Sequence, residues 1–324
     1  MKKVNGILLT AVMLLAAGAA CTQDYPTKPV RMIVPFAPGG SNDIVARIIS
    51  PGLGKELGQP VIVENRPGAS GNIGVELAAR ANPDGYTILI GNNNSMAINP
   101  AMFPKFPIKP ARDFIAVTEV GDIPGALVVH PSVPAKTLKE FIEYAKARPG
   151  KLNYGSAGVG STMRIAMELF MHEAGLKIVH VAYKGGAGAA TIGLLGGEVN
   201  VAMTNLASVL PHIKAGKLRL LAVVAAKRLA VQPDAPTMVE SGFPDMTAGA
   251  WHGVYVPAGT PKPVVNRLFA ATTKTMADPE VIKRFADAGA DVIVSKSPEE
   301  FARFTKSETE LYAKLIEEIG LVGE

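Results

Sequence analysis

The sequence predicts an α/β protein built from two lobes. Short apolar runs alternate with helical patterns, and this strand–helix–strand spacing is typical of parallel sheets with crossover helices. The alternation occurs once before about residue 122 and again after it. With 324 residues, the chain is long enough for two hydrophobic cores. We therefore expect one lobe formed by residues 24–122 and 249–324, and a second formed by residues 123–248.

The first alternating unit begins with a buried strand at residues 30–36. A helical pattern starts at Asp43, and Pro51 predicts a kink or an early end within it. The unit continues with strands at residues 61–63 and 86–90 and a helix at 71–80. Residues 121–125, which hold two glycines and a proline, are expected to form the first crossing between the lobes.

The second unit repeats the same design without an obvious sequence repeat. Its expected strands are residues 126–130, 152–155, 178–183, 199–203 and 218–225, and its expected helices are 138–147, 163–174, 187–195 and 206–215. Trp251 is placed at the return crossing, where it packs the hinge or lines the cleft. A strand at residues 254–256 and helices at 264–276, 280–287 and 298–319 complete the first lobe.

The first 23 residues read as a signal peptide. Lys2 and Lys3 precede an apolar stretch at residues 7–20, which is shorter than the ~20 residues that span a bilayer. Cleavage is expected near residues 19–21, and an ordinary first helix of the fold is the alternative. Cys21 follows Gly18, Ala19 and Ala20 and could be lipidated, although Gly18 stands where a lipoprotein signal usually has Leu. Either form of cleavage predicts a periplasmic protein.

Charge and cysteine content exclude several classes of function. The net charge of +5 is spread thinly along the chain. The sequence has no basic run with interleaved aromatic residues, so nucleic-acid binding is not expected. Cys21 is the only cysteine, so an intrachain disulfide and a cysteine-based metal site are both excluded. The five histidines show no metal-ligand spacing. We expect no metal and no cofactor.

Two loops rich in Gly and Ser carry the strongest functional signal. Residues 35–43 and 154–162 each lead from a predicted strand into a predicted helix. Glycine lets the backbone approach a ligand, and a helix N-terminus offers unpaired N–H groups and partial positive charge to an anion. One such end contributes on the order of 0.3–1 kcal/mol, so two facing loops clamp an anion better than one. The alternative is that Ser41, Asn42 and Thr162 only cap their helices.

Several segments resemble the Bug family, the substrate-binding proteins of tripartite tricarboxylate transporters. Residues 34–47, VPFAPGGSNDIVAR, are similar to the opening signature of that family. Further similar segments are residues 63–69, 72–74, 97–100, 183–187, 211–218 and 257–261. The resemblance therefore runs from about Tyr25 to the C-terminus.

The resemblance implies a type II periplasmic-binding-protein fold, in which two lobes close on a small carboxylate held partly through ordered waters. Together with the departures described next, it points to these ligand-binding candidates: Phe36, Pro38, Gly39, Gly40, Ser41, Asn93, Ser95, Ser156, Gly160, Ser161, Thr162, Arg164, Lys184, Thr204 and Asn205. Asp43 is expected to cap its helix and order the loop, because a carboxylate repels an anionic ligand. The implied partners are the membrane components of a tripartite tricarboxylate transporter, and a monomer is expected.

Three positions depart from the family pattern. Residues 92–96, NNNSM, replace a loop usually rich in Thr, Ser and His, and form either a polar turn or a set of amide contacts for the ligand. Arg164 replaces a His and either pairs with a second carboxylate or is solvated. Thr204 replaces an Asp before Asn205, which argues against an amino-acid ligand. Citrate-like acids, C4-dicarboxylates and aromatic acids such as nicotinate or terephthalate remain open.

An enzymatic function lacks a reactive constellation. No G-x-S-x-G elbow surrounds Ser156 or Ser161, and no Walker A or dinucleotide loop is present. We therefore predict no catalytic residue. The rival functions are a ligand-binding subunit for a sensor kinase and, less favoured, a hydrolase or isomerase that uses Ser161.

Overall fold

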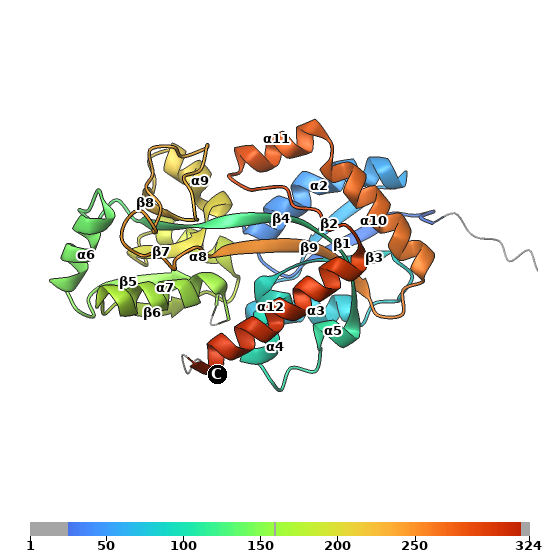
Figure 1. The fold of residues 1–324 in the computed structure, drawn as a ribbon, viewed down its shortest axis with the longest axis horizontal. Coiled ribbons are helices and arrows are strands. Elements are labelled where there is room, and N and C mark those ends of the chain that lie inside the picture. The colour runs from blue at the N-terminus through green and yellow to red at the C-terminus, as the bar shows by residue number, and fades with distance from the viewer. Residues whose placement is uncertain (1–24, 159, 319–324) are drawn as a thin grey trace, which may run out of the picture.

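The computed structural model describes residues 25–158 and 160–318. Within these ranges, nine strands form one sheet in the order β2-β1-β3-β9-β4-β7-β5-β6, with β8 paired to β4. Figure 1 shows that this sheet passes through two lobes, with β4 and β9 as the long strands that join them. The predicted signal peptide and Cys21 lie outside the described residues.

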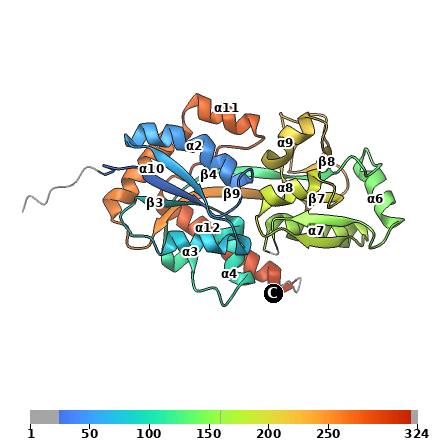
Figure 2. The same cartoon turned by 180° about the vertical axis from the view of Figure 1, so that it is seen from behind.

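In the first lobe, a parallel sheet is covered by helices on both faces. Strands β1 (Val30–Val34), β2 (Val61–Asn65) and β3 (Thr87–Asn92) pair in parallel. Helices α2 (Ser41–Leu57), α10 (Lys262–Met276) and α11 (Pro279–Asp287) lie on one side. Helices α3 (Asn72–Ala79), α4 (Asn99–Met102) and α12 (Pro298–Glu318) lie on the other side (Figures 1 and 2). The lobe also contains the short helices η1 (Ala69–Gly71), η2 (Asn94–Ile98) and α5 (Pro110–Asp113).

Strand β4 (Phe114–Val129) joins the lobes without a break. Its first half pairs with the antiparallel strand β9 (Gly249–Pro257), and its second half pairs with the second lobe. The predicted strand at residues 126–130 is therefore the second half of β4, and residues 121–125, the predicted crossing, lie inside the same strand. The two register shifts lie earlier, between Ala116 and Thr118 and between Glu119 and Gly121, and Pro124 pairs opposite Gly249. Both crossings therefore lie inside strands.

The second lobe has the same layered design. Strands β5 (Asn153–Ser156), β6 (Val179–Ala182) and β7 (Val201–Asn205) pair in parallel, and β8 (Arg219–Val224) pairs antiparallel with β4. Helices α6 (Leu138–Lys146) and α7 (Thr162–Ala174) pack into one core cluster, and α8 (Ala187–Leu195) and α9 (Leu206–Lys214) pack into another. Each parallel strand ends at the cleft side, where the next helix begins.

Helix α2 runs through Pro51 to Leu57, so the predicted early end is wrong. Proline removes one backbone hydrogen bond, and this cost is offset when the rest of the helix is well packed. Val45, Ile49 and Leu53 form a buried stripe at intervals of four residues. Pro51 itself is exposed, so its ring displaces no core side chain.

Trp251 packs helix α12 onto the crossing strand β9. Its ring makes edge contacts with Phe301 and Phe304, and its Nε1 donates a 2.9 Å hydrogen bond to Glu308 Oε2. The side chain is buried in the first lobe and does not line the cleft pocket. Among the described helices, none is long and apolar enough to span a membrane.

Candidate functional site

A narrow pocket lies between the two lobes at the carboxyl ends of the strands, the usual ligand position in open α/β sheets. The pocket is small: its volume of about 20 Å³ has room for about one water molecule. The lining residues are Phe36, Gly40, Ser41, Asn42, Asn92, Asn94, Ala157, Ser161, Thr162, Met163, Ala187, Met203, Thr204, Asn205 and Ala250. None of them carries a charged side chain.

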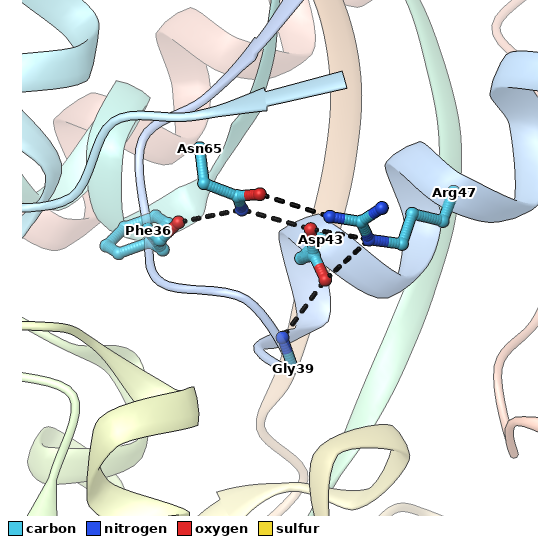
Figure 3. A network of polar contacts seen from close by, with 5 residues as sticks. All are labelled: Phe36, Gly39, Asp43, Arg47 and Asn65. Atoms are coloured by element: carbon cyan, nitrogen blue, oxygen red, sulfur yellow. Dashed lines mark hydrogen bonds and ion pairs between the residues drawn. The ribbon is translucent and has the colours of Figure 1, made fainter. Parts of the chain in front are cut away.

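The first loop is held by the buried carboxylate of Asp43 (Figure 3). One oxygen accepts a 3.0 Å hydrogen bond from the Gly39 N–H, and the other accepts one from Asn65 Nδ2. Asn65 Nδ2 also donates to the Phe36 carbonyl, and Arg47 Nε pairs with Asp43 from one turn further along α2. Burial opposes ionisation of Asp43, but the bonds from Arg47, Gly39 and Asn65 hold its pKa below the ordinary value. The ionised carboxylate therefore orders the loop.

This loop presents the start of α2 to the pocket. Gly40 is the N-cap in extended conformation, and Ser41 and Asn42 are the first helical residues. Asn42 Nδ2 donates to the Ile90 carbonyl and ties the helix start to β3. The first N–H groups of a helix have no intrahelical acceptor, so this end can receive an anion.

The Ser41 side chain, at the start of α2, makes a hydrogen bond between the two lobes. Asn205 Nδ2 donates to Ser41 Oγ at 2.6 Å, and His252 Nε2 lies 3.0 Å from the same oxygen. His252 is fully buried on β9, and burial lowers its pKa to about 3. The imidazole is therefore neutral at physiological pH, and its tautomer decides whether Ser41 donates to it or accepts from it.

The second loop presents the start of α7. Ser161 is the N-cap, and its hydroxyl accepts a hydrogen bond from the Arg164 N–H. Ser156 lies behind the loop, where its Oγ is 2.7 Å from His180 Nε2 and accepts from the Gly158 N–H. Ser156 therefore shapes the loop and does not line the pocket.

Direct hydrogen bonds join the lobes around the pocket. Asn94 Oδ1 accepts from Thr162 N at 2.9 Å and from Thr162 Oγ1 at 2.8 Å. The Ala37 N–H donates to the Gly185 carbonyl at 3.0 Å. Together with the bond between Asn205 and Ser41, these contacts hold the described lobes in a closed arrangement.

Helices α8 and α9 also begin at the pocket, at Ala187 and after Asn205. The pocket therefore receives the N-terminal ends of α2, α7, α8 and α9. Their partial positive charge is not cancelled by any charged lining residue. This arrangement can stabilise an anion without a lysine or arginine side chain.

The structure brings about half of the predicted site residues together. The predicted residues that line the pocket are Phe36, Gly40, Ser41, Ser161, Thr162, Thr204 and Asn205. The predicted residues that do not line it are Pro38, Gly39, Asn93, Ser95, Ser156, Gly160, Arg164 and Lys184.

Asn93 and Ser95 are used within the first lobe. Asn93 Nδ2 donates to the Gly249 carbonyl on β9. Ser95 Oγ is bonded to the side chain and backbone of Asn92. Asn92 and Asn94 line the pocket instead, since the chain turns into η2 directly after β3.

Pro38, Gly39 and Gly160 act through the backbone. The Pro38 carbonyl lies so close to Gly188 that a Cβ there would be 2.4 Å from its oxygen. A Cβ on Gly160 would lie 2.7 Å from Asn99 Oδ1 of the opposite lobe. Gly188 and Gly160 therefore permit the close approach of the lobes, whereas Gly39 meets no neighbour and is set apart by its positive φ of 80°.

Arg164 and Lys184 lie away from the pocket. Arg164 Nε is 3.7 Å from Glu168 Oε1, one turn further along α7, and the Glu168 carboxylate also accepts from Tyr154 Oη. Lys184 is exposed in the turn before α8.

Sequence reasoning missed Asn42, Asn92, Asn94, Ala157, Met163, Ala187, Met203 and Ala250. Asn42 and Asn94 could have been predicted from the sequence, because Asn42 belongs to the first Gly/Ser-rich loop and Asn94 to the asparagine run. The apolar lining residues have no such signal, since an inward-facing Met or Ala reads as core. No group of three or more potential metal ligands occurs in residues 25–158 and 160–318.

A family model described as the tripartite tricarboxylate transporter family receptor matches residues 45–321. This chain belongs to that receptor family. BugT of Bordetella pertussis is 36% identical over 318 residues, which cover 98% of this chain and 96% of BugT. The periplasmic binding protein BugD shares 34% identity with a TM-score of 0.88, over 93% of this chain and 100% of BugD.

A third similar protein carries a ligand. MatC from Rhodopseudomonas palustris, solved with bound malate, is 32% identical to this chain. The match has a TM-score of 0.83 and covers 90% of this chain and 100% of MatC. The resemblance to Bug proteins and the predicted periplasmic-binding-protein fold are confirmed.

Proposed function

We propose that this protein captures a small carboxylate between its lobes in the periplasm and delivers it to the membrane components of a tripartite tricarboxylate transporter. The observation that carries the proposal is the pocket built from the N-termini of α2 and α7, which face each other from opposite lobes. The malate bound to MatC, a relative of the same fold, supports a carboxylate as the ligand class.

The lining residues favour an acid without an ammonium group. Thr204 and Asn205 are neutral, and no Asp or Glu lines the pocket to pair with a cation. Polar groups on both lobes, including Asn42 and Asn94, can bind a second carboxylate or a hydroxyl. We therefore favour a small dicarboxylate over an amino acid, whose charged amine would be left unpaired.

Closure is the proposed working motion. A ligand that contacts both lobes binds the closed arrangement better than an open one, and it shifts the population toward closure by that difference in affinity. The closed form is then the one that the membrane components recognise.

Calorimetry with malate, succinate, adipate and citrate tests the ligand class directly. At least one of these acids is expected to bind with a Kd of about 1 µM or below, roughly −8 kcal/mol. Aspartate, glucose and inorganic phosphate serve as comparisons. Binding of only glucose or phosphate would reject the carboxylate clamp.

Gly40→Leu tests the first loop. Gly40 has φ −78°, which suits any residue, and a Cβ there would make ordinary contacts with Ala37 and Gly188. The added side chain is expected to fill the cleft and weaken binding of the best acid by about 100-fold or more. Gly196→Leu is the matched control, since Gly196 has φ −79° and is exposed at the end of α8. Equal affinities for the two variants would remove this loop from the site.

A further inference from the structure

Asn94 combines a contact across the cleft with a place in the pocket lining. It is the first residue of η2 in the first lobe, and its Oδ1 accepts two hydrogen bonds from Thr162, the first residue of α7 in the second lobe. The amide oxygen therefore occupies one of the N–H groups that a ligand anion would otherwise meet at this helix.

Chemistry fixes which way the Asn94 amide faces. A backbone N–H can only donate, so the atom beside Thr162 N must be the oxygen. The NH₂ group then points to the other side of the planar amide. It donates to no acceptor among the described residues, and Asn94 lines the pocket. Its two N–H bonds are therefore available to a ligand.

The backbone around Asn94 is held as well. Its N–H donates to Asn93 Oδ1, and Asn93 Nδ2 donates to the Gly249 carbonyl on the crossing strand β9. The turn that follows is π-helical, a rare conformation that often marks functional sites. Asn93 thus positions Asn94 and does not itself line the pocket.

An asparagine of the second lobe makes a similar hydrogen bond to the first lobe. Asn205 Nδ2 donates to Ser41 Oγ, and Ser41 is the first residue of α2. Each lobe therefore reaches, through an asparagine, the first residue of the helix that faces the pocket from the other lobe. This reciprocity indicates that the contact between Asn94 and Thr162 belongs to closure and is not an incidental surface contact.

We propose, on the basis of the carboxylate-binding function above, that Asn94 is a specificity-determining residue that couples closure to ligand recognition. Its oxygen fastens α7 to the first lobe, and its NH₂ group donates to an oxygen of the bound acid. The acid then binds best when the lobes close around it with this contact made, because the amide is then held by Thr162; the pocket, which has room for about one water molecule here, widens to admit the acid.

Asn94→Asp separates the two roles. The aspartate oxygen still accepts from Thr162 and lies favourably at a helix N-terminus, so closure is retained. It offers no donor and brings negative charge beside the acid. We expect the affinity for malate or adipate to fall by at least about 100-fold while the lobes stay closed. Gln59→Glu, which adds the same charge to the first lobe away from the pocket, is expected to bind normally.

Two further variants release the contact. Asn94→Ala removes the acceptor. Thr162→Pro removes both donors while leaving Asn94 intact, and it suits the fold because proline is tolerated at the first helical position after an extended residue such as Ser161. Both variants are expected to open the lobes. Thr162→Pro should weaken binding by about 10-fold, and Asn94→Ala by more, because it also loses the NH₂ donor to the acid. Spin labels on cysteines at the exposed positions Lys55 and Lys146, with Cys21→Ser as background, report the distance between the lobes.

The outcomes are distinct. The proposal is overturned if Asn94→Asp binds malate and adipate as the parent does, or if it opens the lobes as Asn94→Ala does. It is also overturned if Thr162→Pro leaves the lobe distance unchanged. If the parent binds none of the acids, the proposed function fails and the recognition role falls with it. The lobe distances measured without acid then still decide whether Asn94 holds the closed arrangement.

Discussion

At the scale of single residues, burial decides what a charged pair contributes. Asp43 and Arg47 have the same spacing on α2 as Glu76 and Arg80 have on α3. The Asp43 side chain is 5% exposed and also holds the Gly39 N–H, whereas the Glu76 side chain is 39% exposed. An exposed pair at this spacing is worth about 0.3–0.5 kcal/mol, but a buried carboxylate that satisfies several donors is worth more.

Asp43→Ala is therefore expected to lower the free energy of unfolding by about 1–3 kcal/mol, because the loop loses the shared acceptor of the bonds from Gly39, Arg47 and Asn65. Binding of malate should weaken too, since the loop before α2 loses its anchor. Glu76→Ala is the control and should change the free energy by less than about 0.5 kcal/mol. Urea unfolding of the two variants measures the difference, and equal losses would contradict this role of Asp43.

At the scale of elements, α2 shows that tertiary packing can override a local signal. Pro51 predicts an interruption, yet the helix continues to Leu57 because its opposite face is buried against the sheet. The same holds for β4, where residues 121–125 predict a crossing between lobes but stay inside the strand: residues 121–124 pair with β9, and Gly125 pairs with β7 and β8. Both elements are longer than their local sequence indicates, and both lead into the cleft.

Pro51→Ala is expected to stabilise the protein. The new N–H can donate to the carbonyl one turn earlier, and alanine lacks the steric cost of proline in a helix. We expect a gain of about 1–2 kcal/mol, below the full ~3 kcal/mol because proline also restricts the unfolded chain. Thermal unfolding tests this, with Lys55→Ala on the same helix as control. A lower melting temperature for Pro51→Ala would show that the helix depends on proline at this position.

At the scale of the whole molecule, buried acids gather where α12 packs on the crossing strand β4. Burial raises the pKa of Glu119 to about 7, and the charges of Asp122, Glu308 and Glu300 add to this. Burial likewise raises the pKa of Asp122 to about 6. The folded state therefore holds these protons more tightly than the unfolded chain. The stability they contribute is complete at low pH and is lost as pH rises toward 7.

Glu119→Gln should remove this loss for one of the two acids. Relative to the parent, we expect a gain of about 1–3 kcal/mol near pH 8 that disappears near pH 4. Urea unfolding across this pH range measures the gain. Glu310→Gln, on the exposed side of α12, is the control and should show little pH-dependent difference. A gain for Glu119→Gln that is the same at both pH values would contradict the assigned cause.

The α/β class, the two loops that lead into helices and the family were all predictable from the sequence, because these depend on local periodicity, turn residues and contiguous motifs. Which polar groups face the pocket depends instead on the tertiary fold. Asn94 meets Thr162 across 68 positions, and Asn205 meets Ser41 across 164. Asn93 and Ser95 are equally polar neighbours of Asn94, but their side chains make their hydrogen bonds within the first lobe. The direction of a side chain at the end of a strand depends on how the chain turns and on which distant group can accept or donate, and neither is encoded in local spacing.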